Sequence, residues 1–509
     1  MSVLDDRGLW SLVEQRAALS PDRVLVVDEH QRSVTFGEFR HLAERAAAGL
    51  YAQGVGHNTR VMWMLPTWIE SLVLSAALAR LGAVQVPLIP VYREREVGFI
   101  ARQCAAPLLL VPHVWRGTDY VALATTATAT MDAPPRLVVV DRALPDGDPS
   151  TLPPPPPSPA PDELRWIFYT SGTTSDPKGA KHSDATIAAS SWGMIEPWRL
   201  SDDDVMTLIF PYAHIGGVSL LIISLMAGNE LVIVETFDRQ LVIDALMRNG
   251  VTLAGSGPAF WRTFIDEQQQ HERRLFPRLR LLIGGGAAKP ANMQRDAREV
   301  LGVDVVSGYG LTECPALVLN HAGDPDDVLA TDGRTMVGAE MRIVHLDGVV
   351  ARPDEEGEIQ VRGDMLFLGY LDESLDADAL TDDGWLHTGD LGRMDARGQL
   401  TVTGRLKDVI IRKGENISAK EVEDVLVHHV EVRDVAVIGL PDDERGERCC
   451  AVIVPVAPEH PPTLADLVAH CIAAGLMRQK IPEQLEVLDA LPYNSTGKVL
   501  KADLRKRYT

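Results

Sequence analysis

The sequence predicts an α/β fold with a large N-terminal region of several subdomains and a smaller α+β region at the C-terminal end. Between residues 7 and 330, short apolar strands alternate with helices and glycine turns, which favours doubly wound, mainly parallel sheets. After residue 330, alternating apolar and polar residues with many Asp-Gly and Arg-Gly turns favour a small antiparallel β-barrel. The compact α+β segment follows this barrel and begins near Gly404.

The individual elements follow from local patterns in chain order. The apolar run Val24–Val27 predicts a strand, and Thr35 is the expected cap of a helix over residues 36–53. Gly82 is expected to end a helix over residues 70–81. Further strands are expected at 61–65, 84–88, 206–210, 251–254, 279–283, 303–306, 409–412, 435–438 and 450–454, and further helices at 239–249, 419–427 and 464–474.

Composition limits the classes of function. The 509-residue chain carries a net charge of −22, which argues against a nucleic-acid partner because nothing resembles a basic groove. The five cysteines are odd in number and share no metal-like spacing, which indicates reduced thiols and a cytoplasmic protein. The first residues have no apolar core, and the apolar region 215–234 is interrupted by Gly228-Asn229-Glu230. We therefore expect neither a signal peptide nor a membrane span, and a homodimer stays open.

A proline-rich run divides the N-terminal region. Seven of the ten residues 152–161 are proline. Such a segment cannot form core helix or sheet, so we expect a solvent-exposed connector.

The segment Tyr169–Gly179 directly after it carries the most informative functional pattern. An apolar strand over 166–169 breaks into hydroxyl residues, glycines and one lysine, and an Ala/Ser-rich helix is expected next. Glycines let backbone N–H groups converge, hydroxyl groups add donors, and Lys178 adds a positive charge. A polyphosphate is the ligand that uses all of these groups. The loop is not a Walker loop, because the lysine precedes the second glycine.

Small-residue turns are expected after the C-terminal ends of three later strands, at the sheet edge where ligands of open α/β folds bind. They cover residues 255–257, 284–287 and 307–313. Tyr309 can lie against a flat base, Thr312 can donate to a phosphate, and Glu313 can bind Mg²⁺. His214, before two glycines, is either exposed to the adjacent space or a hydrogen-bonded core histidine.

Six motifs in this order resemble the superfamily of adenylate-forming enzymes, which holds acyl-CoA ligases, firefly luciferase and the adenylation domains of peptide synthetases. The resemblance spans nearly the whole chain. The motifs are Tyr169–Gly179, Pro211–Gly217, Tyr309–Glu313, Gly357–Tyr370, Thr388–Leu391 with Gly404–Glu423, and Pro492–Lys498. The resemblance implies that a substrate carboxylate attacks ATP, giving an acyl-adenylate and pyrophosphate, and that a thiol then attacks the adenylate. ATP, Mg²⁺ and coenzyme A are the implied cofactors and cosubstrates.

The resemblance also implies a role for each matching residue. The implied catalytic residues are Lys498, His214, Thr312 and Glu313, and Glu313 also places the metal. The implied nucleotide and CoA contacts are Thr170, Ser171, Gly172, Thr173, Thr174, Lys178, Gly285, Gly286, Ala287, Tyr309, Gly310, Asp390, Arg405, Lys407, Arg412 and Gly414. The implied acid-substrate contacts are His214, Ile215, Gly216, Ser256, Gly284 and Gly308.

Domain movement is implied as well. An N-terminal domain, residues 1–406, is expected to bind ATP and the acid, and a mobile C-terminal domain, residues 407–509, to rotate about Lys407. Lys498 is then expected to bridge the carboxylate and the α-phosphate during adenylation. Asp390 is expected to accept from the ribose hydroxyls, and Arg412–Gly414 to face CoA after rotation.

One residue departs from the family pattern. Ser175 stands where the phosphate loop usually carries glycine. If the backbone there needs a positive φ, serine strains the loop by about 1 kcal/mol and weakens adenylation. A ligase that acts mainly in thioester formation is therefore an alternative.

The first functional hypothesis is an acyl-CoA ligase for an apolar carboxylic acid. Small and apolar residues at the expected acyl pocket predict a bulky alicyclic, polycyclic or medium-to-long-chain acid rather than acetate. Two alternatives are a stand-alone enzyme that loads a carrier protein and an oxygenase of the luciferase type. No acidic residue of Pro211–Gly217 could hold an amino acid's ammonium group, which argues against amino-acid loading.

Overall fold

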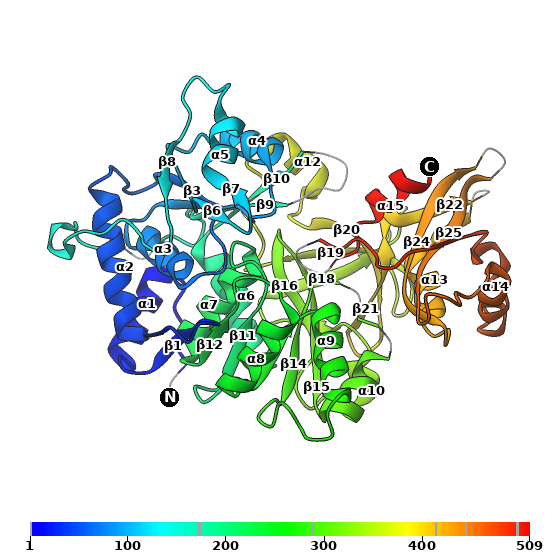
Figure 1. The fold of residues 1–509 in the computed structure, drawn as a ribbon. Coiled ribbons are helices and arrows are strands. Elements are labelled where there is room, and N and C mark those ends of the chain that lie inside the picture. Colours follow the sequence, from blue (N-terminus) through cyan, green and yellow to red (C-terminus); the bar gives the residue numbers. More distant parts are fainter. Residues whose placement is uncertain are drawn as a thin grey trace.

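The computed structural model describes residues 3–157, 159–170, 176–287, 289–290, 292–412, 415–442, 445–494 and 498–509. Six residues singled out above lie outside these ranges: Ser171, Gly172, Thr173, Thr174, Ser175 and Gly414. Figure 1 shows the chain as a large body with a smaller unit at one end, which carries the five-stranded sheet and the C-terminus.

A 13-stranded sheet forms the centre of the large body. Its strand order is β18-β19-β20-β21-β17-β16-β15-β14-β13-β11-β12-β1-β2, and the segment from β15 to β1 is parallel. The strands are β1 (Val24–Val27), β2 (Ser33–Thr35), β11 (Val205–Leu208), β12 (Glu230–Ile233), β13 (Leu253–Ser256), β14 (Leu281–Gly285), β15 (Asp304–Leu311), β16 (Cys314–Leu319), β17 (Gly333–Thr335), β18 (Ala339–Val344), β19 (Gly357–Gly363), β20 (Leu386–Met394) and β21 (Gln399–Arg405).

A six-stranded sheet lies on the same body, with the order β10-β9-β4-β3-β5-β8. Its strands are β3 (Arg60–Trp63), β4 (Val84–Pro87), β5 (Leu108–Val111), β8 (Arg136–Val139), β9 (Trp166–Thr170) and β10 (Lys178–His182), and a small hairpin of β6 (Val114–Trp115) and β7 (Thr118–Asp119) is separate. Both faces of this sheet are buried, because Val61 and Trp63 join one apolar cluster and Met62 and Met64 join another.

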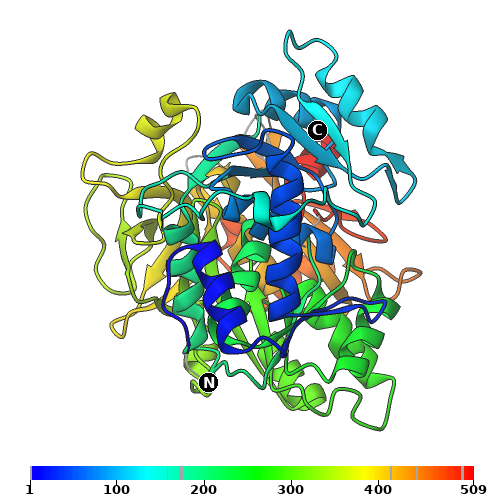
Figure 2. The same cartoon turned by 90° about the vertical axis from the view of Figure 1, so that its left-hand side faces the viewer.

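Helices cover both faces of the two sheets, as the alternating pattern predicted. They are α1 (Leu9–Leu19), α2 (Phe36–Tyr51), α3 (Ile69–Arg80), α4 (Glu94–Cys104), α5 (Tyr120–Thr128), α6 (Asp184–Ile195), α7 (Ile215–Ala227), α8 (Arg239–Asn249), α9 (Pro258–Gln269), α10 (Met293–Asp296), α11 (Asp326–Leu329) and α12 (Asp376–Ala379). Apolar residues of α1, α2, α3, α6 and α7 share one core between the sheets, and those of α8 and α9 pack on the other face of the large sheet. The blue N-terminal helices face the viewer in Figure 2.

The smaller unit has an α+β fold, as predicted. Its sheet pairs β22 (Val409–Arg412), β23 (Glu415–Ser418), β24 (Val432–Asp442), β25 (Gly446–Pro455) and β26 (Gln484–Val487), and its helices are α13 (Ala419–Leu426), α14 (Leu464–Ala473) and α15 (Lys501–Tyr508). Arg405 is the last residue of the chain that pairs in the large sheet, and Val409 is the first that pairs in the small one. The division into domains at residues 406 and 407 stays a prediction.

Three local expectations need correction. The phosphate-loop segment leads into strand β10, which pairs antiparallel with β9, and the Ala/Ser-rich helix starts only at Asp184. Of the expected turn at residues 307–313, residues 307–311 are instead the end of β15, whose glycines pair with β14 and β16, and only residues 312–313 turn. The strands expected to form a barrel, β17 to β21, extend the large sheet, and the described residues show no pairing that closes a ring.

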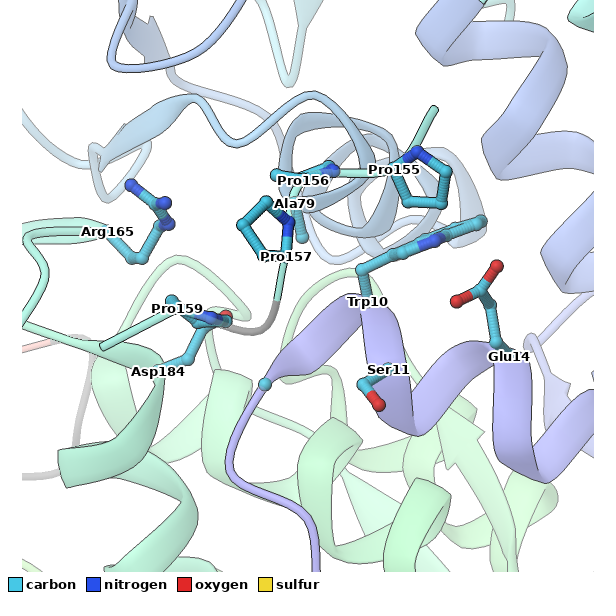
Figure 3. A pocket seen from close by; sticks show the side chains of 11 residues that line it. Trp10, Ser11, Glu14, Ala79, Pro155, Pro156, Pro157, Pro159, Arg165 and Asp184 are labelled. Atoms are coloured by element: carbon cyan, nitrogen blue, oxygen red, sulfur yellow. The ribbon is translucent and has the colours of Figure 1, made fainter. Parts of the chain in front are cut away.

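The proline-rich run is mostly exposed, as expected, but it packs against α1. Arg80 donates from Nη2 to the carbonyl of Pro153 at 2.7 Å, and the guanidinium lies over the Trp10 ring. A small cavity of about 150 Å³ lies between Trp10 of α1 and Pro155–Pro157, and Figure 3 shows the side chains that line it. Arg80 of α3 therefore links the connector, by one hydrogen bond, to the first helix, by a cation–π contact.

Candidate active site

The tip of the β15–β16 hairpin carries two of the predicted catalytic residues. Leu311 and Cys314 are paired across the hairpin, so Thr312 and Glu313 form the turn between them. A two-residue turn leaves both side chains free of the strand ladder. The turn is fixed from outside, because Phe367 donates its backbone N–H to the Glu313 carbonyl at 2.8 Å.

Asp390 of β20 contacts two other predicted nucleotide-binding residues, Tyr309 of β15 and Arg405 of the neighbouring strand β21. The Tyr309 hydroxyl donates to Oδ2 of Asp390 at 2.7 Å, and Arg405 Nε lies 2.8 Å from Oδ1. Asp390 is only 5% exposed, and burial together with its charge raises the pKa of Tyr309 well above the usual value. The buried carboxylate is therefore an oriented acceptor, paired with one cation and one phenol.

Lys498 enters this group from the C-terminal unit. Its ammonium group is desolvated beside Arg405, Asp390, Lys407 and Asp408, and burial and the neighbouring Arg405 lower its pKa to about 8. Within the described parts of the chain, its Nζ has no carboxylate at ion-pair distance. The structure thus places at the junction of the two units a cation that has no counter-ion within 4 Å among the described residues.

His214 faces the same charge. It caps α7, and its Nδ1 accepts from the Gly216 N–H at 3.1 Å, while its ring meets Phe210 edge-on. Desolvation and the charge of Lys498 lower its pKa to about 4. The imidazole is therefore neutral near pH 7 and carries its proton on Nε2, which stays available as a donor. His214 therefore combines the two predicted alternatives: it is hydrogen-bonded, and it also faces the space that Lys498 occupies.

Lys178 and Thr170 pair across the β9–β10 hairpin that flanks the predicted phosphate loop. The Lys178 ammonium lies 5.3 Å from the centre of the Tyr370 ring, and the Tyr370 hydroxyl donates to Glu313 Oε1 at 2.6 Å. A predicted phosphate-binding cation and the predicted metal ligand are thus joined by one aromatic side chain. In the sequence Tyr370 marks only the end of a motif, and no role was predicted for it.

His182 is a second residue without a predicted role. Its Nε2 lies 2.9 Å from the Thr312 carbonyl and its Nδ1 2.9 Å from the Thr186 hydroxyl. A carbonyl can only accept, so Nε2 carries the proton. Complete burial lowers the pKa of His182 to about 4 and keeps it neutral. His182 therefore holds the backbone of Thr312 in place. The only sequence signal for this role was the presence of a histidine shortly after the phosphate-loop motif.

Glycines at the strand ends are required by close backbone approach. A Cβ at Gly284, whose φ is +135°, would lie 1.9 Å from the Ser256 carbonyl oxygen, and one at Gly308 would lie 2.5 Å from the Val318 oxygen. Gly285 and Gly310 would each meet a carbonyl oxygen at 2.3 Å. The expectation was that missing side chains at these glycines make room for a bulky acid. That argument was wrong, because the space beside each of them is filled by neighbouring backbone.

The predicted CoA-side residue Arg412 lies apart from this group, whereas the predicted pivot Lys407 lies beside Lys498. Arg412 forms a bidentate pair with Glu483 inside the C-terminal unit, with Nε–Oε2 and Nη2–Oε1 distances of 2.9 and 2.5 Å. Lys407 lies in a short 3₁₀ helix, Leu406–Asp408, between the two sheets. Of the other predicted contacts, Ile215 and Gly216 start α7, Ser256 ends β13, and Ala287 follows β14. Their roles stay predictions.

The described residues fit a nucleotide and a metal. A Cβ at Gly286, whose φ is +78°, would meet no atom within 4 Å, so the backbone beside β14 is open to a flat base. The buried Asp390 carboxylate suits ribose hydroxyls, and Lys178 suits phosphate oxygens. Oε2 of Glu313 has no hydrogen bond to the described residues, which fits Mg²⁺, a metal that takes few protein carboxylates together with phosphate oxygens.

Family profiles match both parts of the chain. The profile described as AMP-binding enzyme matches residues 13–371, and the profile described as AMP-binding enzyme C-terminal domain matches residues 421–498. The chain belongs to the AMP-binding enzyme family.

Full-length relatives of this AMP-binding enzyme include a medium-chain fatty-acid–CoA ligase of Escherichia coli, 32% identical over 98% of this chain and 91% of the relative. A salicyl-AMP ligase / salicyl-S-ArCP synthetase of Mycobacterium tuberculosis is 33% identical over 97% and 90%. A solved o-succinylbenzoate coenzyme A synthetase from Bacillus subtilis, in complex with ATP and a magnesium ion, superposes with a TM-score of 0.82, 27% identity and coverage of 97% and 99%. The predicted resemblance to adenylate-forming enzymes is confirmed. Among the described residues, no helix is both long and apolar enough to cross a membrane.

The lowered pKa of Lys498 predicts a pH dependence of this AMP-binding enzyme. A lysine is charged below its pKa, so the cation is present at pH 6–7 and is lost as the pH rises through about 8. We expect kcat/KM for pyrophosphate release to fall tenfold per pH unit above that value, because kcat/KM reports groups of the free enzyme. His214 titrates near 4 and should contribute no ionisation between pH 6 and 9.

Lys498→Arg is the matched control for this profile. A guanidinium stays charged above pH 12, so this variant should lose the alkaline decline even if its rate is lower throughout. An identical alkaline decline in both proteins would assign the ionisation to another group.

Proposed function

We propose that this AMP-binding enzyme is an acyl-CoA ligase for an apolar carboxylic acid. In the first step a carboxylate oxygen bonds to the α-phosphorus of ATP. The bond between that phosphorus and the bridging oxygen to the β-phosphate breaks, and pyrophosphate leaves with its electron pair. In the second step the CoA thiolate attacks the acyl carbon, and AMP leaves. The two steps would use different orientations of the C-terminal unit.

Each step of adenylation has a residue suited to it. The developing charge on the phosphate oxygens would be stabilised by Lys178, by Thr312 and by Lys498, because fixed donors act best where charge accumulates. Bound Mg²⁺ would neutralise phosphate charge beside Glu313. Neutral His214 would offer Nε2–H to the entering acid without repelling Lys498.

The observation that carries the proposal is the position of Lys498. It reaches from the C-terminal unit to a group formed by Asp390, Arg405 and His214. A desolvated cation is costly unless an anion accompanies it. The substrate carboxylate and the α-phosphate are anions that would meet it there, which supports an adenylation arrangement.

The acid is proposed to be apolar because the start of α7 is apolar. Ile215 and Val218 are buried, and Phe210 lies edge-on to His214. A medium-chain acid is favoured by the E. coli relative. A bulky ring acid stays a second possibility for the substrate, although the strand-end glycines no longer support it.

Coenzyme A is the proposed thiol acceptor, and a carrier protein is the alternative. The salicyl relative is named for a product other than a CoA thioester, so the family relation alone does not decide between them. Arg412 is held by Glu483 in this arrangement and would face CoA only after rotation.

The test measures pyrophosphate release and thioester formation with ATP, Mg²⁺, an acid panel, and either CoA or a phosphopantetheinylated carrier. The panel contains acetate, octanoate, decanoate, cyclohexanecarboxylate and salicylate. Six additional buried CH₂ groups at about 0.8 kcal/mol each would favour octanoate over acetate by roughly 3 × 10³-fold in kcat/KM. Equal use of acetate would contradict the apolar pocket, and thioester formation on the carrier alone would contradict CoA as the acceptor.

A further inference from the structure

Tyr370 lies between two oppositely charged residues of the candidate site. Its hydroxyl donates to Oε1 of Glu313 at 2.6 Å, and the Lys178 ammonium lies 5.3 Å from its ring centre. Both neighbours were predicted to act on the phosphates and the metal, and Tyr370 contacts both at once. Tyr370 itself is only 5% exposed.

The tyrosine is held rigidly from three directions. Its backbone N–H donates to Asp376 Oδ1 at 2.8 Å, and its backbone pairs with Ala180 of β10 in an isolated bridge. The next residue, Leu371, donates to the Gly179 carbonyl at 2.7 Å, and Phe367 packs edge-on against the ring at 4.9 Å. The ring position is therefore set by the same strand that carries Lys178.

The hydrogen bond leaves one carboxylate oxygen of Glu313 for another ligand. A carboxylate has two oxygens, and the phenol occupies Oε1 only. Partners of this kind fix the direction of a metal-binding carboxylate, and their loss commonly weakens metal affinity 10- to 100-fold. A phenol is a suitable partner because it donates without adding charge.

The ring also separates Lys178 from Glu313. No ion pair joins these two residues in the described structure, although each contacts the same tyrosine. A direct pair would neutralise both the cation needed for phosphate and the anion needed for metal. An aromatic face attracts an ammonium group less strongly than a carboxylate does, so Lys178 can be released to a phosphate.

We propose that Tyr370 is a positioning residue that orients Glu313 toward Mg²⁺ and keeps Lys178 unpaired for the phosphates of ATP. This inference rests on the proposed function, because it assumes that Mg²⁺ and ATP bind at the hairpin tip. It goes beyond that function by assigning a role to a residue that touches neither reacting atom.

The experiment separates the hydroxyl from the ring. Tyr370→Phe keeps the ring under Lys178 and removes the donor to Glu313, whereas Tyr370→Leu removes both contacts. Tyr120→Phe is the matched control, because Tyr120 is 1% exposed and donates its hydroxyl to the Pro90 carbonyl at 2.9 Å, away from Glu313 and Lys178. Each protein is titrated by calorimetry with a non-hydrolysable ATP analogue at several Mg²⁺ concentrations, and its melting temperature is recorded without ligand.

We expect Tyr370→Phe to raise the Mg²⁺ concentration needed for half-maximal nucleotide binding by 5- to 30-fold, with affinity at saturating Mg²⁺ changed less than threefold. Tyr370→Leu should in addition weaken binding at saturating Mg²⁺ about tenfold, and Tyr120→Phe should match the unaltered protein in its Mg²⁺ requirement. An unchanged Mg²⁺ requirement in Tyr370→Phe, with or without a lower melting temperature, would overturn the positioning role alone. Absence of nucleotide binding by the unaltered protein would overturn the proposed function and this inference together.

Discussion

Replacing Lys498 with alanine should lower the rate of adenylate formation by roughly 10²- to 10³-fold, which corresponds to about 3–4 kcal/mol of transition-state stabilisation. The ammonium lies desolvated among Asp390, Arg405 and His214, where the carboxylate and α-phosphate are proposed to meet. Thioester formation from supplied acyl-AMP should change less than threefold, because the proposed rotation takes Lys498 away from the nucleotide before that step. The two half-reactions are measured separately, as pyrophosphate release and as CoA-thioester formation.

Lys506→Ala is the control for this experiment. Lys506 is an exposed lysine of α15, eight positions further along the chain, and its replacement removes the same charge without touching the site. Both half-reactions should keep their rates in this variant. Equal losses of the two half-reactions in Lys498→Ala would contradict the alternation of the C-terminal unit. In the same assay, the rates of the unaltered protein show whether adenylation is slower than thioester formation, as the alternative based on Ser175 predicts.

Local signals predicted much of the fold. The strand Val24–Val27 and the strand Val409–Arg412 have the bounds that the apolar runs predicted. Thr35 caps α2 in a full capping box with Glu38, because the side chain of one residue satisfies the backbone of the other. These elements depend on residues within a few positions, so the sequence pattern was sufficient.

Strand β10 could not be recognised in the same way. Its residues, Lys178–His182, are small or polar and carry no apolar alternation, yet they pair with the whole of β9. The pairing is stabilised from a distant segment, since the Leu368 N–H donates to the Lys181 carbonyl and the Leu371 N–H donates to the Gly179 carbonyl. Tertiary contacts over almost 200 positions outweigh local propensity here.

The motifs predicted which residues lie near one another in the candidate site, but not the contacts that fix their positions. Tyr309, Asp390 and Arg405 were expected near the nucleotide, and they lie in direct contact. His182 and Tyr370 fix Thr312 and Glu313 from segments 130 and 57 positions away, and only the folded chain shows these contacts. The role of the strand-end glycines was also visible only in the folded chain. They lack side chains because neighbouring backbone lies too close for a Cβ, not because a substrate needs the space.

The link between the two units offers a way to stop rotation without disturbing the site. Arg405 has φ −131° and ψ 140°, an extended conformation that a residue before proline prefers. Leu406 is the first residue of the 3₁₀ helix, a position that accepts proline well. Within the described chain, the Leu406 N–H has no backbone acceptor, so proline there removes no backbone hydrogen bond of the present arrangement.

Leu406→Pro should therefore leave adenylation within about threefold of the unaltered rate and slow thioester formation from acyl-AMP by tenfold or more. Proline fixes φ near −65°, which suits the 3₁₀ helix but opposes the torsional change that rotation of residues 407–509 would need. Leu406→Ala removes the same side chain and leaves φ free, so its thioester rate should stay near that of the unaltered protein. Comparable thioester rates in the proline and alanine variants would show that the torsion at residue 406 does not carry the rotation, and would place the pivot at Lys407 or beyond.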